Sequence, residues 1–500
     1  MIAAGELDRT SWTKDRYYPL FLAVCLTSTG VIAFTDDILV MMAALAAPVA
    51  VGWRAVKGDF LHPIIWFGLA YMLYSDAGPL LGYMDLNPII WGGYRFELGD
   101  YVQAMRVEGL AGIAAFLAIG INTVDVRRPL REGKELWKIS SFAWPMFWLT
   151  LVGSLALIRF IAASGFADKF DLIARGGVLT RASFVFILLS TASVLLIVRE
   201  TSIKRRPLIA WLIVASVSVF FVLVVLTMGQ RNYFFRWAVL LAMLASAYGF
   251  RFRLWMMTAG AAVGGLLMAA MNYMKMSLVR STAAPEDAAV VGGMMLNFIT
   301  RIGLVGVTKW TWAMWSALFA YVALSAEFST PGTNLALLIG HWPTGMPHYG
   351  PKVLWDELIT SFLPGFLNAV PDRAVAQVIF IDMFFPGALE IGKGYGCGIV
   401  PEGYMIWGMP GAILLLGLVG LIIRWAYRRA ATGIISLLFY INVAPIVAFA
   451  LRADMTSLFS QSWKHAWLPL FGIYLANRLR LQYLALREER LGASLHLSAE

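Results

Sequence analysis

Long apolar stretches recur along this chain and limit its fold more than any other feature. A helix needs about 20 apolar residues to cross a bilayer, and roughly twelve segments satisfy that rule. They centre on 18–34, 38–53, 61–75, 104–121, 140–161, 182–198, 208–228, 234–249, 254–273, 404–423, 434–451 and 466–476. Because 60% of the residues are hydrophobic and 14% are charged, too little polar surface remains to cover a soluble globule. We predict an all-α polytopic membrane protein with about twelve transmembrane helices.

The basic residues between these segments set the expected topology. They gather in every second loop, within 54–57, 127–138, 199–206, 251–253, 424–429 and 478–487. Cytoplasmic loops carry such an excess of Arg and Lys, so most of the net charge of +10 needs no nucleic-acid partner. Both termini are therefore expected in the cytoplasm, and the long connection before the tenth helix is expected outside it.

Four regions follow from this topology. Residues 1–274 would hold helices one to nine, and 275–403 a large extracytoplasmic loop with short helices. Residues 404–478 would hold helices ten to twelve, and 479–500 a cytoplasmic tail. No removable signal peptide is expected at the N-terminus. The two cysteines, Cys25 and Cys397, suggest no disulfide framework, and no Cys and His cluster indicates a metal site.

A glycine-rich stretch at 392–420 is the first candidate site. Its alternating glycines allow backbone to approach a ligand or another backbone closely, and Pro401 is suited to the start of a helix. Glu402 follows at the expected lipid boundary. An acid in a first helical turn is stabilised by the helix dipole in any case. The cleared space beside Glu402 favours a catalytic role.

Several cations and histidines on the outer side are further candidates. Arginine presents a planar fork of donors that fits phosphate oxygens. Arg231 follows the seventh segment, Arg280 closes the ninth, and Arg301 lies among apolar residues. A snorkelling arginine at a helix end is the ordinary alternative. His341 and His348 could accept a proton near neutral pH, although a loop histidine bonded to backbone is the commoner case.

An acidic pair, Asp36 and Asp37, follows the first apolar segment. An aspartate in the first outer loop would suit a GT-C glycosyltransferase that uses a lipid-phosphate sugar. A tight turn between two helices needs polar residues anyway.

Three motifs, taken in order, resemble those of Wzy-type O-antigen polymerases, also called oligosaccharide repeat unit polymerases. Gly229-Gln230-Arg231 resembles the family's Gly-x-Arg motif, and 362–366 with 370–373 resembles its proline-rich stretch. The stretch from 396 through Glu402 to Gly411 resembles its closing motif. The resemblance covers 228–420. The chain departs from the family where Asn232 follows the arginine in place of a small residue.

The resemblance implies polymerisation of undecaprenyl-diphosphate-linked oligosaccharide repeat units at the periplasmic face of a bacterial inner membrane. It implies that Arg231, Arg280, Arg301 and Arg373 bind the diphosphate. It also implies Glu402, with His341 or His348 second, as the acceptor of the hydroxyl proton. A chain-length regulator and a flippase would be partner proteins. No Asp-x-Asp motif is present for a metal-bound sugar nucleotide, so no cofactor is expected.

Three other functions stay open. An O-antigen ligase shares this layout and differs in its acceptor. A GT-C enzyme would depend on Asp36 or Asp37. A transporter or flippase of lipid-linked glycans should show inverted repeats, broken helices and mid-membrane charges. The sequence suggests neither repeats nor such helices, and its charges collect on one face, which favours an enzyme.

Overall fold

Helices are the only regular elements in the described part of this computed structural model. That part comprises residues 5–84, 94, 97–133, 136–163, 178–228, 231–253, 255–257, 259–260, 330–342, 347–362, 375–387 and 396–497. Helices are expected because a backbone in lipid must satisfy its N–H and C=O groups within its own segment. The prediction of an all-helical polytopic membrane protein is confirmed at this level.

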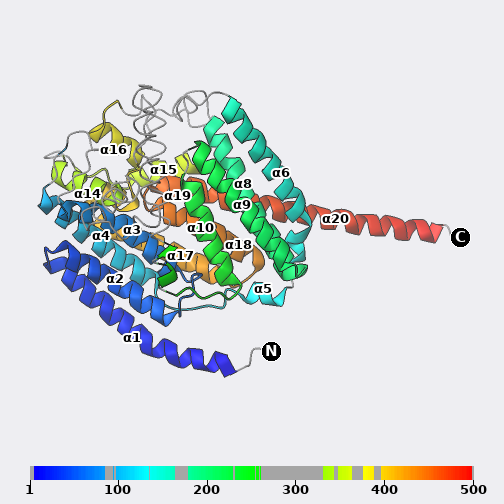
Figure 1. Ribbon diagram of the computed structural model, residues 1–500, viewed down its shortest axis with the longest axis horizontal. Helices are drawn as coiled ribbons and strands as arrows, with labels where there is room; N and C mark the ends of the chain where they lie inside the picture. Colours follow the sequence, from blue (N-terminus) through cyan, green and yellow to red (C-terminus); the bar gives the residue numbers. More distant parts are fainter. Residues whose placement is uncertain are drawn as a thin grey trace, which may run out of the picture.

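The first half of the chain and the last quarter build one helical bundle (Figure 1). Its helices are α1 (Gly5–Phe34), α2 (Ile38–Ala55), α3 (Pro63–Tyr83), α4 (Leu98–Ile119), α5 (Arg128–Glu132), α6 (Trp137–Ala163), α8 (Val178–Val198), α9 (Pro207–Met228), α10 (Arg231–Ala247), α17 (Ile399–Ala430), α18 (Ile434–Ala450), α19 (Met455–Ser462) and α20 (Leu468–Leu497). The short helices α14 (Thr330–His341), α15 (Lys352–Phe362) and α16 (Ala376–Phe384) gather at one side, away from α5.

Eight helices of the described part are long and apolar enough to cross a membrane: α1, α2, α3, α4, α6, α8, α9 and α17. Two shorter apolar helices, Tyr233–Ala247 and Ile434–Ala450, match the expected eighth and eleventh segments. The ninth expected segment lies almost entirely outside the described residues. The twelfth falls in α20, which does not meet the same length and hydropathy criteria. A total of about twelve stays a prediction.

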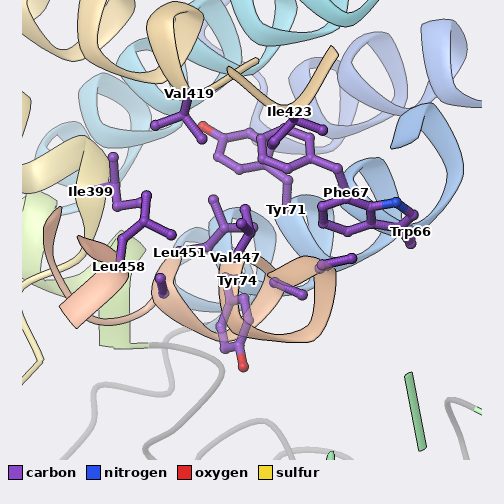
Figure 2. Packing of buried hydrophobic residues seen from close by; sticks show 14 of the residues in the cluster. Trp66, Phe67, Tyr71, Tyr74, Ile399, Val419, Ile423, Val447, Leu451 and Leu458 are labelled. Carbon is purple, nitrogen blue, oxygen red and sulfur yellow. The ribbon is translucent and has the colours of Figure 1, made fainter. Parts of the chain in front are cut away.

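Aromatic and branched side chains join α3, α17 and α18 into a common core (Figure 2). The labelled residues come from α3, α17, α18 and α19, and from the position directly after α18: Trp66, Phe67, Tyr71, Tyr74, Ile399, Val419, Ile423, Val447, Leu458 and Leu451. Small residues also bring α17 against α4. A Cβ on Gly420 would lie 2.7 Å from the carbonyl oxygen of Ala115, so the two backbones touch, as is common for helices packed in membranes.

Three of the predicted cytoplasmic loops meet at one end of the bundle. Asp59 forms ion pairs with Arg127 at 2.7 Å and with Arg251 at 2.8 Å. The backbone N–H of Phe252 donates to Gly58 at 3.3 Å. Tyr427 of α17 reaches the same end, where its hydroxyl donates to the carbonyl oxygen of Val124. Basic loops that the sequence assigns to one side of the membrane thus lie together.

Asp59→Asn should destabilise this end of the bundle by about 1–3 kcal/mol, because two arginines lose their shared carboxylate partner. The side chain of Asp59 is 12% exposed, so water cannot replace the lost charge fully. The check is thermal unfolding of purified protein in detergent. Asp125→Asn is the matched control, because the Asp125–Arg131 pair is half exposed and such pairs contribute about 0–1 kcal/mol. Equal melting temperatures for the two variants would contradict the prediction.

Candidate functional site

The helix α17 is broken near its start. Trp407 and Gly408 depart from helical geometry, with φ −144° and ψ 23° at Trp407 and φ 67° and ψ −152° at Gly408. The second combination is essentially restricted to glycine. The two parts then fold against one another, because a Cβ on Gly411 would lie 2.2 Å from the carbonyl oxygen of Gly403. The expected close approach of backbone to backbone in this stretch is therefore present.

Gly411→Ala should be strongly disruptive, since its methyl group would overlap the backbone of Gly403. We expect a loss of at least about 3 kcal/mol in stability, or no folded protein, because backbone cannot move aside as a flexible side chain does. Gly417→Ala on the same helix is the control, with its nearest neighbour, the Cβ of Ala114, at 3.8 Å. The folded yield and the melting temperature in detergent are measured for both variants. A Gly411→Ala variant as stable as Gly417→Ala would contradict this packing.

The segment before the break is held by hydrogen bonds from distant parts of the chain. The buried amide of Asn334 in α14 donates to the carbonyl oxygens of Gly396 at 2.6 Å and Cys397 at 3.2 Å. The backbone N–H of Gly398 donates to Ala453, in the turn after α18. These bonds fix the first turn of α17, and with it the position of Glu402.

Two glutamates face one another in the interior. Glu402 of α17 and Glu357 of α15 are both 0% exposed, and their carboxyl groups are within hydrogen-bonding reach. Oε2 of Glu402 accepts the backbone N–H of Met455 at 2.8 Å, and Oε1 of Glu357 accepts that of Ala376 at 2.9 Å. We call Glu357 and Glu402 the acid pair. The acid pair ties α15 to the start of α17.

A third buried acid lies beside the acid pair. Asp454 is 1% exposed and caps α19, where its Oδ1 accepts the backbone N–H of Ser457 at 2.7 Å. Burial raises the pKa of Asp454 above its usual value. Burial likewise raises the pKa of Glu357 to about 7, with a further contribution from the charge of Asp454. Desolvation disfavours the charged form of a carboxyl group, so this site holds protons at a pH where exposed acids do not.

Positive charge collects near the end of α18. The guanidinium carbons of Arg236 and Arg452 lie 4.9 Å and 5.7 Å from the centroid of the same ring, Phe449. Arg236 is 8% exposed and donates to the side chain of Gln461. Within the described part of the chain, no carboxylate forms an ion pair with Arg236.

The same positive charges affect the pKa of His465. Burial, together with the charges of Arg236 and Lys464, lowers the pKa of His465 to about 3, so this histidine is neutral at physiological pH. We call Arg236, Arg452 and Lys464 the cationic cluster. A buried arginine without an acidic partner attracts an anion. Within the cationic cluster, Arg452 lies two residues before Asp454 along the chain.

The two predicted histidines lie away from the acid pair. Pro331 at the start of α14 lies against Gly398, whereas His341 ends α14 ten residues later, about 15 Å along the helix. There its ring lies 5.2 Å from that of Tyr94. His348 lies 5.9 Å from the ring of Tyr404. Because Tyr404 is two residues after Glu402, it points to another face of the helix.

The side chains of the four arginines predicted to bind the diphosphate all lie outside the described part of the chain. Arg231 is the first residue of α10, but its side chain lies outside the described part. Arg280, Arg301 and Arg373 fall in 261–329 and 363–374, also outside it. Their proposed role stays a prediction. Arg236, one and a half turns into α10, is a buried arginine of the described residues.

Asp36 and Asp37 both have structural partners. Asp37 caps α2, and its Oδ1 accepts the backbone N–H groups of Leu39 at 2.8 Å and Val40 at 3.2 Å. Asp36 pairs with Arg106 of α4 at 2.6 Å. The turn and the cap account for the acidic pair without a catalytic role.

A fourth buried acid lies midway along a membrane helix. Glu108 of α4 is 1% exposed, and its Oε2 accepts the hydroxyl of Tyr71 at 2.6 Å. A charge at the centre of a membrane helix costs about 2.5–3.5 kcal/mol on insertion scales. The broken helix α17 and this glutamate correct the sequence-based statement that broken helices and mid-membrane charges are absent.

Comparison with known proteins gives no family for the chain: no protein-family model, no curated protein and no solved structure matches it. The site is therefore interpreted from its own geometry. The motif resemblance to the Wzy-type polymerases stays an expectation from the sequence.

Proposed function

We propose that the protein is a membrane glycosyltransferase that polymerises polyprenyl-diphosphate-linked oligosaccharide repeat units at the extracytoplasmic face. The observation that carries the proposal is that Asp454, beside the acid pair, follows Arg452 by two residues, and that Arg452 shares the Phe449 ring with the buried Arg236. Glycosyl transfer from a diphosphate carrier needs a proton acceptor at one end of the reacting bond and cations at the other. The order of the Wzy-like motifs favours the same reaction.

The position of the site along the bundle supports an outer active site. The acid pair lies at the start of α17, whereas Arg428 and Arg429 end the same helix. Some 20 residues of helix span about 30 Å, the thickness of a hydrocarbon core. The site and the basic end are therefore on opposite sides of a membrane that the helix crosses.

In the proposed reaction, a sugar hydroxyl of one lipid-linked unit attacks the anomeric carbon of another. A new C–O bond forms as the bond from that carbon to the diphosphate breaks. The hydroxyl proton passes to Glu402, and the polyprenyl diphosphate leaves with the bonding electron pair. The cationic cluster stabilises the charge that develops on the diphosphate. The proton then returns to water.

Donor preference tests the proposed enzyme class. Purified protein in liposomes should elongate the glycan of a polyprenyl diphosphate carrier and leave the corresponding monophosphate carrier unchanged. The reason is that the several charges of the cationic cluster match the two phosphates of a diphosphate better than the single phosphate of a monophosphate. Mass spectrometry of the extracted lipids measures both reactions. Turnover of the monophosphate carrier alone would favour the GT-C mechanism, and loss of that turnover in Asp36→Asn would assign it to the acidic pair of the first outer turn.

A second candidate function is transport of lipid-linked glycans, favoured by broken α17 and by Glu108. Transporters bind substrates beside interrupted helices and place ionisable groups near the midplane. Fluorescently labelled lipid-linked oligosaccharide in proteoliposomes separates the two functions. Movement of the intact lipid between leaflets without a new glycosidic bond would identify a transporter, whereas elongated product identifies the polymerase.

A further inference from the structure

The acid pair contains two buried acceptor oxygens that no backbone N–H satisfies. One oxygen of each carboxyl is held by a backbone N–H, that of Ala376 for Glu357 and that of Met455 for Glu402. The other oxygens, Oε2 of Glu357 and Oε1 of Glu402, are buried, and the hydroxyl of Thr456 is the neighbouring donor to Glu357. Two ionised carboxylates have no hydrogen between them to share, so the facing oxygens form a bond only if one is protonated.

We propose that Glu357 and Glu402 share a single proton, and that Glu357 thereby sets the protonation of the base that receives the acceptor hydroxyl proton. This inference rests on the proposed function for the role of Glu402, but the shared proton itself does not. Glu357 is a positioning residue in this account, because it acts on the reacting atoms only through Glu402.

The surroundings favour one retained proton over two charges. The titratable groups that face the pair are Asp454, from the turn after α18, and Cys397, from the segment before α17. Both lack positive charge, and the remaining close neighbour, Thr456, is neutral. No arginine or lysine of the described residues forms an ion pair with either glutamate. Like charges that are buried together cannot both ionise at ordinary pH.

A shared proton is favoured over a bound cation by the arrangement of the acids. The described His, Cys, Asp and Glu side chains include no group of three placed to hold a metal ion. The backbone N–H groups of Ala376 and Met455 already occupy one oxygen of each carboxyl. Each glutamate therefore has one oxygen without a backbone donor, which leaves too few ligand atoms for a metal ion.

The test is the pH profile of polymerisation by purified protein with Glu357→Gln, Glu402→Gln and the control Asp356→Asn, the neighbouring acid on α15. Wild type and Asp356→Asn should lose rate about tenfold per pH unit on the acid side, where Glu402 takes up a proton of its own, and should show a second change where the shared proton is lost. Glu357→Gln should keep the acid side and lose the second change, because an amide N–H replaces the shared proton permanently. Glu402→Gln should be inactive throughout.

The inference would be overturned if folded Glu357→Gln kept the wild-type pH profile of polymerisation, or if it were inactive at every pH.

A second measurement, of thermal stability, does not depend on activity. Because the pKa of Glu357 is raised to about 7, its protonated form stabilises the fold at low pH, and that stabilisation is lost as the pH rises through about 7. The melting temperature of wild type should fall between about pH 4.5 and pH 7, and that of Glu357→Gln should fall less. If wild type is inactive but its melting temperature falls more with pH than that of Glu357→Gln, the proposed function is refuted and the shared proton is supported. If the two melting temperatures change equally with pH, the shared proton is refuted.

Discussion

Glu402→Gln should lower the rate of glycan polymerisation by about 10²–10⁴-fold, the usual contribution of a general base. The amide has the size of the carboxyl and its oxygen can still accept the backbone N–H of Met455, which Glu402 accepts at 2.8 Å. The fold should therefore survive while the proton acceptor is lost. Initial rates with purified protein and matched melting temperatures are the measurement.

Asp36→Asn is the control for this experiment. Asp36 is also an acid, in the turn between α1 and α2, but its side chain is 84% exposed and pairs with Arg106. We expect a normal rate for Asp36→Asn. A folded Glu402→Gln variant with the wild-type rate would remove Glu402 from the reaction, and a selective loss in Asp36→Asn would favour the GT-C mechanism.

Arg236→Gln should lower the same rate by about 10²–10³-fold, the cost of removing one donor to a charge that develops in the transition state. Arg236 is 8% exposed and lies over Phe449, so no mobile surface cation can take its place. Arg236→Lys keeps the charge and loses the planar fork, and it should recover part of the rate.

Two other arginines make this prediction specific. Arg106→Gln is the control, since Arg106 pairs with the exposed Asp36. Arg231→Gln tests the residue chosen from the sequence motif. A large loss in Arg231→Gln with a normal rate in Arg236→Gln would place the diphosphate at the start of α10 and exclude the cationic cluster.

The helical character of the chain could be predicted because each membrane helix is encoded locally by its own apolar residues. The eight expected segments before the ninth each overlap a helix of the bundle. The tenth was expected to begin at 404, whereas α17 begins at Ile399. The break at Trp407 and Gly408 escaped prediction, because a glycine in an apolar run also occurs in unbroken membrane helices.

Only one member of the acid pair, Glu402, could be predicted from the sequence. Glu402 stood out by its position after Pro401, but its partner required the fold. A signal for Glu357 does exist in α15, where Val353, Glu357 and Ser361 are all buried at intervals of four residues. An acid on the buried stripe of a short helix is unusual. Contacts such as Met455 to Glu402, 53 residues apart, have no local signature.

The prediction of Arg231 stays untested, because its side chain lies outside the described residues. Arg231 stands in the Gly-x-Arg pattern, whereas Arg236 lies deeper in the same helix among Phe235 and Trp237. The cost of a charge grows with depth in the membrane. Depth is therefore a second criterion, independent of the motif, for choosing an arginine to test.

Elongation by purified protein in liposomes is the measurement that tests the central claim most directly. Polyprenyl-diphosphate-linked repeat units would be the only glycan supplied, and the products would be resolved as a ladder while released polyprenyl diphosphate is counted. The account predicts products in whole multiples of the repeat unit, with one polyprenyl diphosphate released for each new linkage. Unchanged single units in the presence of folded protein, whether or not they cross the bilayer, would contradict it.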